Sequence, residues 1–223
     1  LSLAGQGAHV VVHYNRSRRD AESLCRDIEA FGVSAWPVCA DLAEGAQVER
    51  LFEEAVARAE AVDILVNNAS IFERDTVWQA TEESIDLNLH IHAMAPLILS
   101  RRLAAQERAG RIVNLLDTRI TVYDRQHASY HISKRVLATL TRMLALELAP
   151  RITVNAVAPG LVLAPAGEDQ GYLERLAQYN PMHTYGSPSD VAEAVVFLLR
   201  TQFTTGQILY VDGGYHMKGH MYE

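Results

Sequence analysis

Short apolar runs alternate with longer segments of helical period along the chain, and this alternation constrains the fold more than any other feature of the sequence. Runs of this length suit strands buried on both faces of a sheet, and the longer segments suit helices. The expected strands are residues 9–14, 35–40, 63–67, 111–116, 152–157 and 207–211. The expected helices are residues 20–31, 46–61, 82–107, 129–148 and 188–200.

Repeated alternation of strand and helix predicts a parallel sheet covered by helices on both faces, with right-handed crossovers. The fold class is therefore α/β, a doubly wound parallel sheet. Residues 1–223 are expected to form one domain, because no linker, repeat or low-complexity tract divides them. The least regular stretch, residues 164–188, is expected to act as a flap over a site. Ligands of such folds bind at the carboxyl ends of the strands, so the residues after each run are the candidates.

The composition narrows the classes of function. Of the 223 residues 49% are apolar, yet no apolar run is long enough to cross a membrane and no secretory leader opens the sequence, so we expect a cytoplasmic protein without a membrane partner. The net charge of −7 argues against binding to nucleic acid. Cys25 and Cys39 have no metal-binding spacing, and the nine histidines form no HExxH motif, so no metal is expected.

Several chemically useful residues stand at the strand ends that this fold would bring together. The segment NNAS (residues 67–70) follows the strand 63–67, Asp117 follows 111–116, and the Pro-Gly pair 159–160 follows 152–157. Tyr130 and Lys134 are four residues apart at the start of an expected helix, so their side chains leave the same face one turn apart. A nearby cation stabilises a phenolate, so Lys134 is expected to lower the pKa of Tyr130 and make it a useful proton donor and acceptor.

Taken together, these motifs resemble the short-chain dehydrogenase/reductase family, in which a strand ending in NNAG, a Ser, a YxxxK pair and a PG turn surround a nicotinamide cofactor. The resemblance extends from Leu1 to about Gly214, where VDGG (211–214) looks like the family's closing strand and turn. It implies a Rossmann-like fold, a small-molecule substrate and a homodimer or homotetramer. The cofactor-binding residues that it implies are Asp41, Leu42, Asn68, Ala69, Ser70, Tyr130, Lys134, Pro159, Gly160 and Leu161.

Two departures from the family pattern point to a subgroup. The usual Ser is Asp117, and the usual NNAG is NNAS with Phe72 two residues beyond Ser70. This combination resembles pteridine reductases and dihydromonapterin reductases, and it implies that Asp117, Tyr130 and Lys134 are catalytic and that Phe72 stacks on a pterin. A carboxylate can hold the amide-like N–H and amino groups of a pterin or relay a proton to it. The alternative for Phe72 is an ordinary core position.

Many members of the family carry a further Asn on the helix before the strand 111–116. Two candidates occupy this region, Asn88 and His92, and counting back four residues from Pro96 selects His92. A histidine can also donate and accept protons. A structural histidine without a role in proton transfer is the alternative.

The end of the first strand indicates which nicotinamide cofactor is bound. An NAD-specific site places an acidic residue there to accept from the ribose 2′-hydroxyl, and the sequence HYNRS (residues 13–17) has none. The guanidinium of Arg16, with donors from His13 and Ser17, suits a phosphate, so NADP(H) is the expected cofactor. The alternative is a solvated turn at the start of a helix, with Ser17 or Asp20 as its N-cap.

The resemblance also implies a strand and a glycine-rich phosphate loop ahead of Leu1, so we expect an N-terminally truncated chain that binds cofactor poorly by itself. In the family's sheet that strand lies between the strands 9–14 and 63–67. We therefore expect these two to lie about two strand spacings apart, roughly 10 Å, with an empty position between them.

The leading functional hypothesis is an NADPH-dependent reductase of a pterin or dihydropterin. The first alternative is a general carbonyl or 3-oxoacyl reductase of the same family. The second, from another class, is a truncated, non-catalytic binding or oligomerisation protein.

Overall fold

The computed structural model describes residues 1–165, 167 and 169–220, and all six predicted strands are present in it. Every strand pair is parallel, as predicted. The middle of β5 is completely buried at Val154, Ala156 and Val157, which explains why its sequence does not alternate between apolar and polar residues. The strands are β1 (Val10–Tyr14), β2 (Ala35–Cys39), β3 (Ile64–Asn67), β4 (Gly110–Leu115), β5 (Ile152–Pro159) and β6 (Ile208–Val211).

The six strands form two sheets. β1 pairs with β2, and the second sheet has the order β3-β4-β5-β6. β1 and β3 are not hydrogen-bonded to each other, which agrees with the predicted empty position between them. Their predicted separation of roughly 10 Å stays a prediction.

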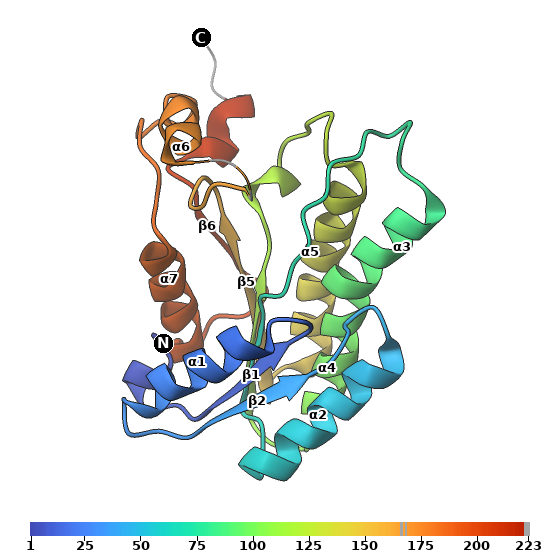
Figure 1. Cartoon of the computed structure of the whole chain (residues 1–223), viewed down its shortest axis with the longest axis vertical. Coiled ribbons are helices and arrows are strands. Elements are labelled where there is room, and N and C mark those ends of the chain that lie inside the picture. Colours follow the sequence, from blue (N-terminus) through green and yellow to red (C-terminus); the bar gives the residue numbers. More distant parts are fainter. Residues whose placement is uncertain (166, 168, 221–223) are drawn as a thin grey trace.

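Helices cover both faces of the sheets (Figure 1). Successive residues of β4 show the division: Ile112 packs in a core with α2, α4 and α5, whereas Val113 packs in a core with α7. Within the described residues, no helix has both the length and the apolar character needed to cross a membrane. The α-helices are α1 (Arg18–Glu29), α2 (Gly45–Ala59), α3 (Glu82–Leu89), α4 (Ala95–Ala104), α5 (Ala128–Leu148), α6 (Gln170–Ala177) and α7 (Pro188–Arg200).

The single helix predicted over residues 82–107 is divided in the structure. α3 passes into a π-helical turn at His90–Met94, and α4 follows and ends at Ala104. Pro96 has no N–H for the carbonyl one turn earlier, and a π-turn accommodates the interrupted ladder of hydrogen bonds. This correction is local, because α3 and α4 still connect β3 to β4 as one crossover.

Two segments near the carboxyl ends of the strands differ from the sequence-based expectation. The expected flap 164–188 contains α6, a helix that the sequence pattern did not indicate. The loop after β4 begins with a 3-10 turn, Thr118–Ile120, and a second 3-10 turn, Tyr215–His220, follows β6. These segments surround the strand ends on which the candidate residues lie.

Candidate active site

The structure brings Asp117 and Tyr130 into direct contact. Asp117 lies two residues beyond the end of β4 and caps the 3-10 turn by accepting from the Arg119 N–H at 2.7 Å. Tyr130 lies in the first turn of α5, and its hydroxyl donates to Asp117 Oδ2 at 2.9 Å. The two side chains that the pterin hypothesis requires at one rim of the sheet therefore meet there.

The environment of Tyr130 keeps the phenol protonated. Burial raises its pKa above the usual value, and the charge of Asp117 and the hydrogen bond to it act in the same direction. The side chain is 6% exposed, so water offers the phenolate little compensation. Tyr130 therefore carries its hydroxyl proton, which it donates to Asp117.

This arrangement corrects our expectation that Lys134 lowers the pKa of Tyr130. The Lys134 ammonium donates to the Leu115 carbonyl at 2.8 Å and lies 5.6 Å from the centroid of the Tyr130 ring. The nearest charge to the phenol is the Asp117 carboxylate, and its effect on the pKa has the opposite sign. Burial also lowers the pKa of Lys134 itself to about 8, although the charge of Asp117 opposes that shift.

His92 is fully engaged as a structural link. Its Nε2 accepts from the Ile71 N–H at 3.2 Å and lies 2.9 Å from Ser70 Oγ, so the proton of the neutral ring is on Nδ1, 2.8 Å from Ser133 Oγ. Burial, with a smaller contribution from the charge of Lys134, lowers the pKa of His92 to about 3. The neutral ring therefore ties the loop after β3 to the helical turn that carries Tyr130.

Asn88, the other candidate for the fourth position, has an open acceptor. Its Nδ2 donates to the Ser84 carbonyl at 2.9 Å, and its Oδ1 is buried without a hydrogen-bond partner among the described residues. It lies just before the π-turn in the divided helix. Of the two candidates, Asn88 is thus the one with a free hydrogen-bonding atom.

Phe72 belongs to the site and not to the core. The side chain is 36% exposed, its ring meets the Tyr130 ring edge-on at 4.8 Å, and it lines the same cavity as Asp117. His127 stacks on the ring at 4.0 Å with the planes 13° apart, and the Arg119 guanidinium lies over it with Cζ 4.9 Å from the centroid. The sequence motifs did not point to His127 or Arg119, although His127 stands only three residues before Tyr130.

The cavity at Phe72, Asp117 and Tyr130 has a volume of about 300 Å³. Five of its lining residues are aromatic, and the flap predicted over residues 164–188 supplies one wall through residues such as Tyr172 and Tyr179. Aromatic walls favour a planar ligand that can stack on them. The lining residues are Phe72, Asp117, Thr118, Arg119, Tyr130, Gly160, Leu161, Leu163, Pro165, Tyr172, Leu176, Tyr179, Asn180, Asp212 and Tyr215.

A buried carboxylate fixes the far wall of this cavity. Asp212, at the end of β6, accepts from the Thr118 hydroxyl at 2.5 Å, from the His216 N–H at 2.8 Å and from the Gly214 N–H at 3.0 Å. Burial alone would raise the pKa of Asp212, but the hydrogen bonds from Thr118 and His216 hold that pKa below its usual value. A Cβ on Gly160 would lie 2.6 Å from Asp212 Cβ, which explains the glycine of the PG turn. Asp212 thus links the segment after β4 to the end of β6, and it packs against the turn after β5.

The predicted cofactor residues occupy the carboxyl ends of the strands. Arg16 and Ser17 are exposed after β1, and Ser17 is the N-cap of α1 without a capping bond from its side chain. His13 Nε2 lies 2.9 Å from the Ala40 carbonyl and links the ends of β1 and β2. The Leu42 side chain is packed in the core that includes Val48 and Phe52, and the contact of this residue with the cofactor stays a prediction. The others lie at strand ends or beside them: Asp41, Asn68, Ala69, Ser70, Pro159, Gly160 and Leu161.

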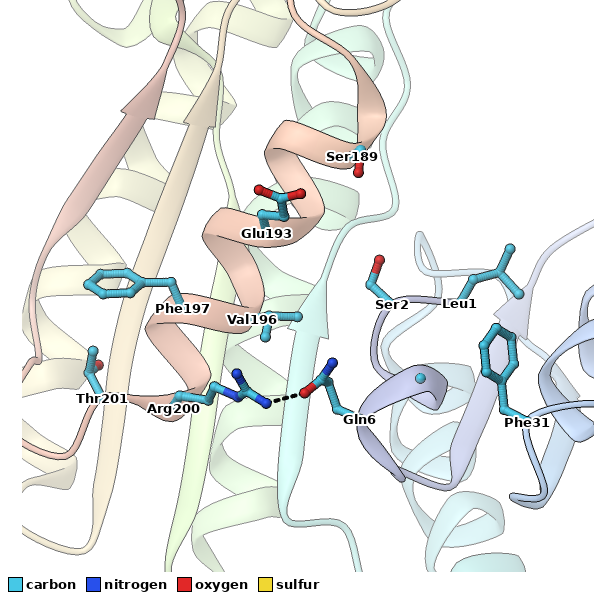
Figure 2. Close-up of a pocket in the computed structure, with 11 residues that line it drawn as sticks. Leu1, Ser2, Gln6, Phe31, Ser189, Glu193, Val196, Phe197, Arg200 and Thr201 are labelled. Atoms are coloured by element: carbon cyan, nitrogen blue, oxygen red, sulfur yellow. Dashed lines mark hydrogen bonds between the residues drawn. The ribbon is translucent and has the colours of Figure 1, made fainter.

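A larger cavity, about 730 Å³, lies between the N-terminal turn and α7 (Figure 2). The Arg200 guanidinium donates to Gln6 Oε1 across it, and Phe31, Val196 and Phe197 supply apolar surface. None of the residues predicted for catalysis or cofactor binding lines this cavity. Of the residues predicted for catalysis, Asp117 and Tyr130 line the smaller, aromatic cavity.

The sequence of the chain matches a family model and individual known proteins. Residues 1–216 match a family model described as enoyl-(acyl carrier protein) reductase. The chain is 32% identical over 231 residues to the 3-oxoacyl-[acyl-carrier-protein] reductase FabG of Staphylococcus epidermidis, covering 97% of this chain and 92% of that protein.

Two solved structures superpose on all or nearly all of the chain. The FolM alternative dihydrofolate reductase 1 of Brucella canis, complexed with NADP, superposes with a TM-score of 0.90 at 33% identity, covering 100% of this chain and 88% of the other. A short-chain dehydrogenase/reductase from Serratia marcescens superposes with a TM-score of 0.89 at 29% identity, covering 96% and 90% of the two chains.

Proposed function

The chain belongs to the short-chain dehydrogenase/reductase family, and from this premise we propose that it reduces a pterin or dihydropterin with NADPH. The observation that carries the proposal is the 2.9 Å hydrogen bond from the Tyr130 hydroxyl to Asp117, next to the ring of Phe72. A hydroxyl group in place of Asp117 would be sufficient to bind a simple carbonyl substrate. A carboxylate can also accept from the N–H and amino groups of a pterin.

The residues at the strand ends fit NADP(H). Arg16 is exposed at the end of β1, where no acidic residue would repel a 2′-phosphate, and its guanidinium can bind a phosphate through two hydrogen bonds. Lys134 would hold the nicotinamide ribose, and Asn68 to Ser70 and the turn at Gly160 would line the remainder of the site. The bound cofactor supplies a hydride. The Brucella canis protein with 33% identity is described as complexed with NADP, which supports the same assignment here.

The chain's own residues supply the proton that must accompany the hydride. Tyr130 donates its hydroxyl proton to the substrate atom that becomes basic as the hydride arrives. The phenolate left behind faces the negative charge of Asp117, so it is unstable and regains a proton rapidly. The charge of Arg119 acts in the opposite direction and offsets part of this repulsion.

A 3-oxoacyl or other carbonyl substrate is the second candidate. The identity to a 3-oxoacyl reductase supports it, and Leu161, Leu163 and Leu176 give the cavity apolar surface on which an acyl chain could lie. The aromatic residues and Asp117 favour the pterin. The third hypothesis, a non-catalytic protein, gives no reason for a buried tyrosine hydrogen-bonded to an aspartate at the strand ends.

A substrate comparison tests the proposal. Purified protein is mixed with NADPH and either a dihydropterin or a 3-oxoacyl thioester, and cofactor oxidation is followed by absorbance. We expect turnover of the dihydropterin with a higher kcat/KM, and weaker activity with NADH. Activity on the thioester alone would transfer the assignment to the second candidate, and no activity on either would favour the third.

The family resemblance also supports an oligomer, which we propose is a homodimer or homotetramer. α5 exposes several large apolar side chains, among them Ile132, Met143 and Leu146, and the last is 84% exposed. Apolar side chains clustered on one exposed helix are typical of protein interfaces. Light scattering of the wild type and of Leu146→Glu would test this, because a charge in such an interface should shift the protein toward monomers.

A further inference from the structure

A second group of titratable side chains lies next to the active site and takes no part in the chemistry described above. Asp124, in the loop between β4 and α5, accepts from the Gln126 N–H at 2.7 Å. Its Oδ2 lies 3.1 Å from His127 Nδ1, 3.2 Å from His131 Nε2 and 3.6 Å from Arg119 Nε. The described residues include no group of three or more ligands arranged to hold a metal ion, so this cluster has a different purpose.

The hydrogen bonds determine how the two imidazoles are protonated. A carboxylate only accepts, so His127 Nδ1 carries a hydrogen and donates it to Asp124. His131 Nδ1 accepts from the Arg135 guanidinium at 2.9 Å, so the hydrogen of the neutral ring is on Nε2, which lies 3.2 Å from Asp124 Oδ2 but makes no hydrogen bond among the described residues. Asp124 thus fixes the orientation of the His127 ring, and His127 is only 6% exposed.

The oriented His127 ring lies directly on Phe72. The stack, at 4.0 Å and 13°, occupies one face of Phe72. The Arg119 guanidinium also lies over the ring, with Cζ 4.9 Å from the centroid, so a substrate that stacks on the remaining face has to displace it. Backbone hydrogen bonds join the same two segments: the Asp75 N–H donates to Gln126 at 2.9 Å, and the Ala128 N–H donates to Asp75 at 3.0 Å. The loop that carries Phe72 is therefore attached to the start of α5 by both its backbone and this stack.

We propose that His127, oriented by Asp124, is a positioning residue that fixes the Phe72 ring as the wall on which a planar heteroaromatic substrate stacks. This inference rests on the proposed function, since it assigns Phe72 a substrate that can stack. The positioning role also predicts a preference of the site among substrates. A substrate with an aromatic ring depends on the orientation of Phe72, whereas a small aliphatic ketone reduced at Tyr130 does not.

The test compares His127→Ala, which removes the stack, with His127→Phe, which keeps an aromatic ring but cannot donate to Asp124. Loss of the stacking interaction between His127 and Phe72 should raise KM for a dihydropterin about threefold to tenfold. We expect kcat to change less than twofold. We expect His127→Phe to recover most of the affinity. Asp124→Asn should give an intermediate KM, and His90→Ala, an exposed histidine on the π-turn, should have no effect.

The same variants are assayed on a small aliphatic ketone, for which KM should not change. An unchanged dihydropterin KM in His127→Ala, or equal losses on both substrates, would overturn the positioning role. If the wild type reduces no dihydropterin, the proposed function itself fails, and this result is distinct from either pattern in the variants. If His127→Ala does not fold, His127→Phe and Asp124→Asn carry the comparison.

Discussion

The Tyr130 hydroxyl donates to the Asp117 carboxylate at 2.9 Å, while the Lys134 ammonium is turned to the Leu115 carbonyl. The partner of the phenol is thus an anion. This relationship keeps Tyr130 protonated and makes it a weaker acid than an unperturbed tyrosine, so in the proposed reaction Asp117 controls how easily Tyr130 gives up its proton. Both roles have consequences for activity that can be measured.

Replacing Tyr130 by Phe removes the proton donor and leaves the packing of the ring nearly unchanged. A positioned acid contributes typically about 100-fold to 10,000-fold to rate, so kcat/KM should fall by that order. Steady-state kinetics with NADPH measure the loss. Tyr123→Phe is the matched control, because Tyr123 is 84% exposed. Retention of full activity in Tyr130→Phe would remove this tyrosine from the mechanism.

Asp117→Asn keeps the shape of the side chain and removes its charge. Since the charge of Asp117 and its hydrogen bond raise the pKa of Tyr130, the variant should have a lower Tyr130 pKa than the wild type. Ultraviolet difference titration of the tyrosines, with Tyr130→Phe as the reference, measures this shift. Turnover of a dihydropterin should fall at least tenfold, by analogy with the loss of other proton-handling groups. A Tyr130 pKa that does not move would show that the contact is weaker than its geometry indicates.

The buried His92 predicts a specific pH dependence of stability. Its folded-state pKa of about 3 lies below the unfolded value of about 6.5, so proton binding favours the unfolded chain. The contribution of His92 to the free energy of unfolding is therefore complete above pH about 6.5. It is lost as the pH falls toward about 3, at up to about 1.4 kcal/mol per pH unit. Urea unfolding at several pH values measures the slope. His92→Gln, which can still donate and accept, should show a shallower loss, and identical slopes would contradict the assignment.

The link between Thr118 and Asp212 should matter for stability as well as for the cavity. Thr118→Val leaves a buried carboxylate without one of its donors, which should cost about 1–3 kcal/mol. Thermal unfolding measures this loss, and Thr118→Ser, which keeps the hydroxyl, should retain most of the stability. Because Thr118 adjoins Asp117 and also lines the cavity, we expect KM for the substrate to rise in Thr118→Val. Equal stability of the Val and Ser variants would show that the hydrogen bond contributes little.

The sequence predicts the framework of this fold well, because buried parallel strands produce apolar runs that are easy to recognise. It also predicts the meeting of Asp117 and Tyr130, because the carboxyl ends of parallel strands share one edge. The break at Pro96 and the helix α6 were missed, since both depend on local turns with weak sequence signals. The motif also gives no side-chain direction for Leu42, which packs in the core.

The direction of the Tyr130 pKa shift could not be inferred from the YxxxK spacing. That spacing fixes which helix face carries the two side chains, but not where the lysine ammonium finds its acceptor. The cluster around Asp124 is similar. Residues 121–127 have no periodic pattern, and only the folded loop brings Asp124 next to His127 and His131. Contacts made by loops across the structure are therefore the part that the sequence did not predict.

The end of β1 should determine the choice between NADPH and NADH. Arg16 is exposed there, and a guanidinium beside a 2′-phosphate makes strong, charge-assisted hydrogen bonds. Arg16→Ala should raise KM for NADPH about tenfold or more and leave KM for NADH nearly unchanged, since losing a hydrogen bond to a charged group costs about 1.5–3 kcal/mol. The control is Arg26→Ala, an exposed arginine near the other end of α1. Steady-state kinetics with both cofactors measure the ratio of the KM values for NADPH and NADH. Equal effects of Arg16→Ala on the two KM values would mean that Arg16 does not bind the 2′-phosphate.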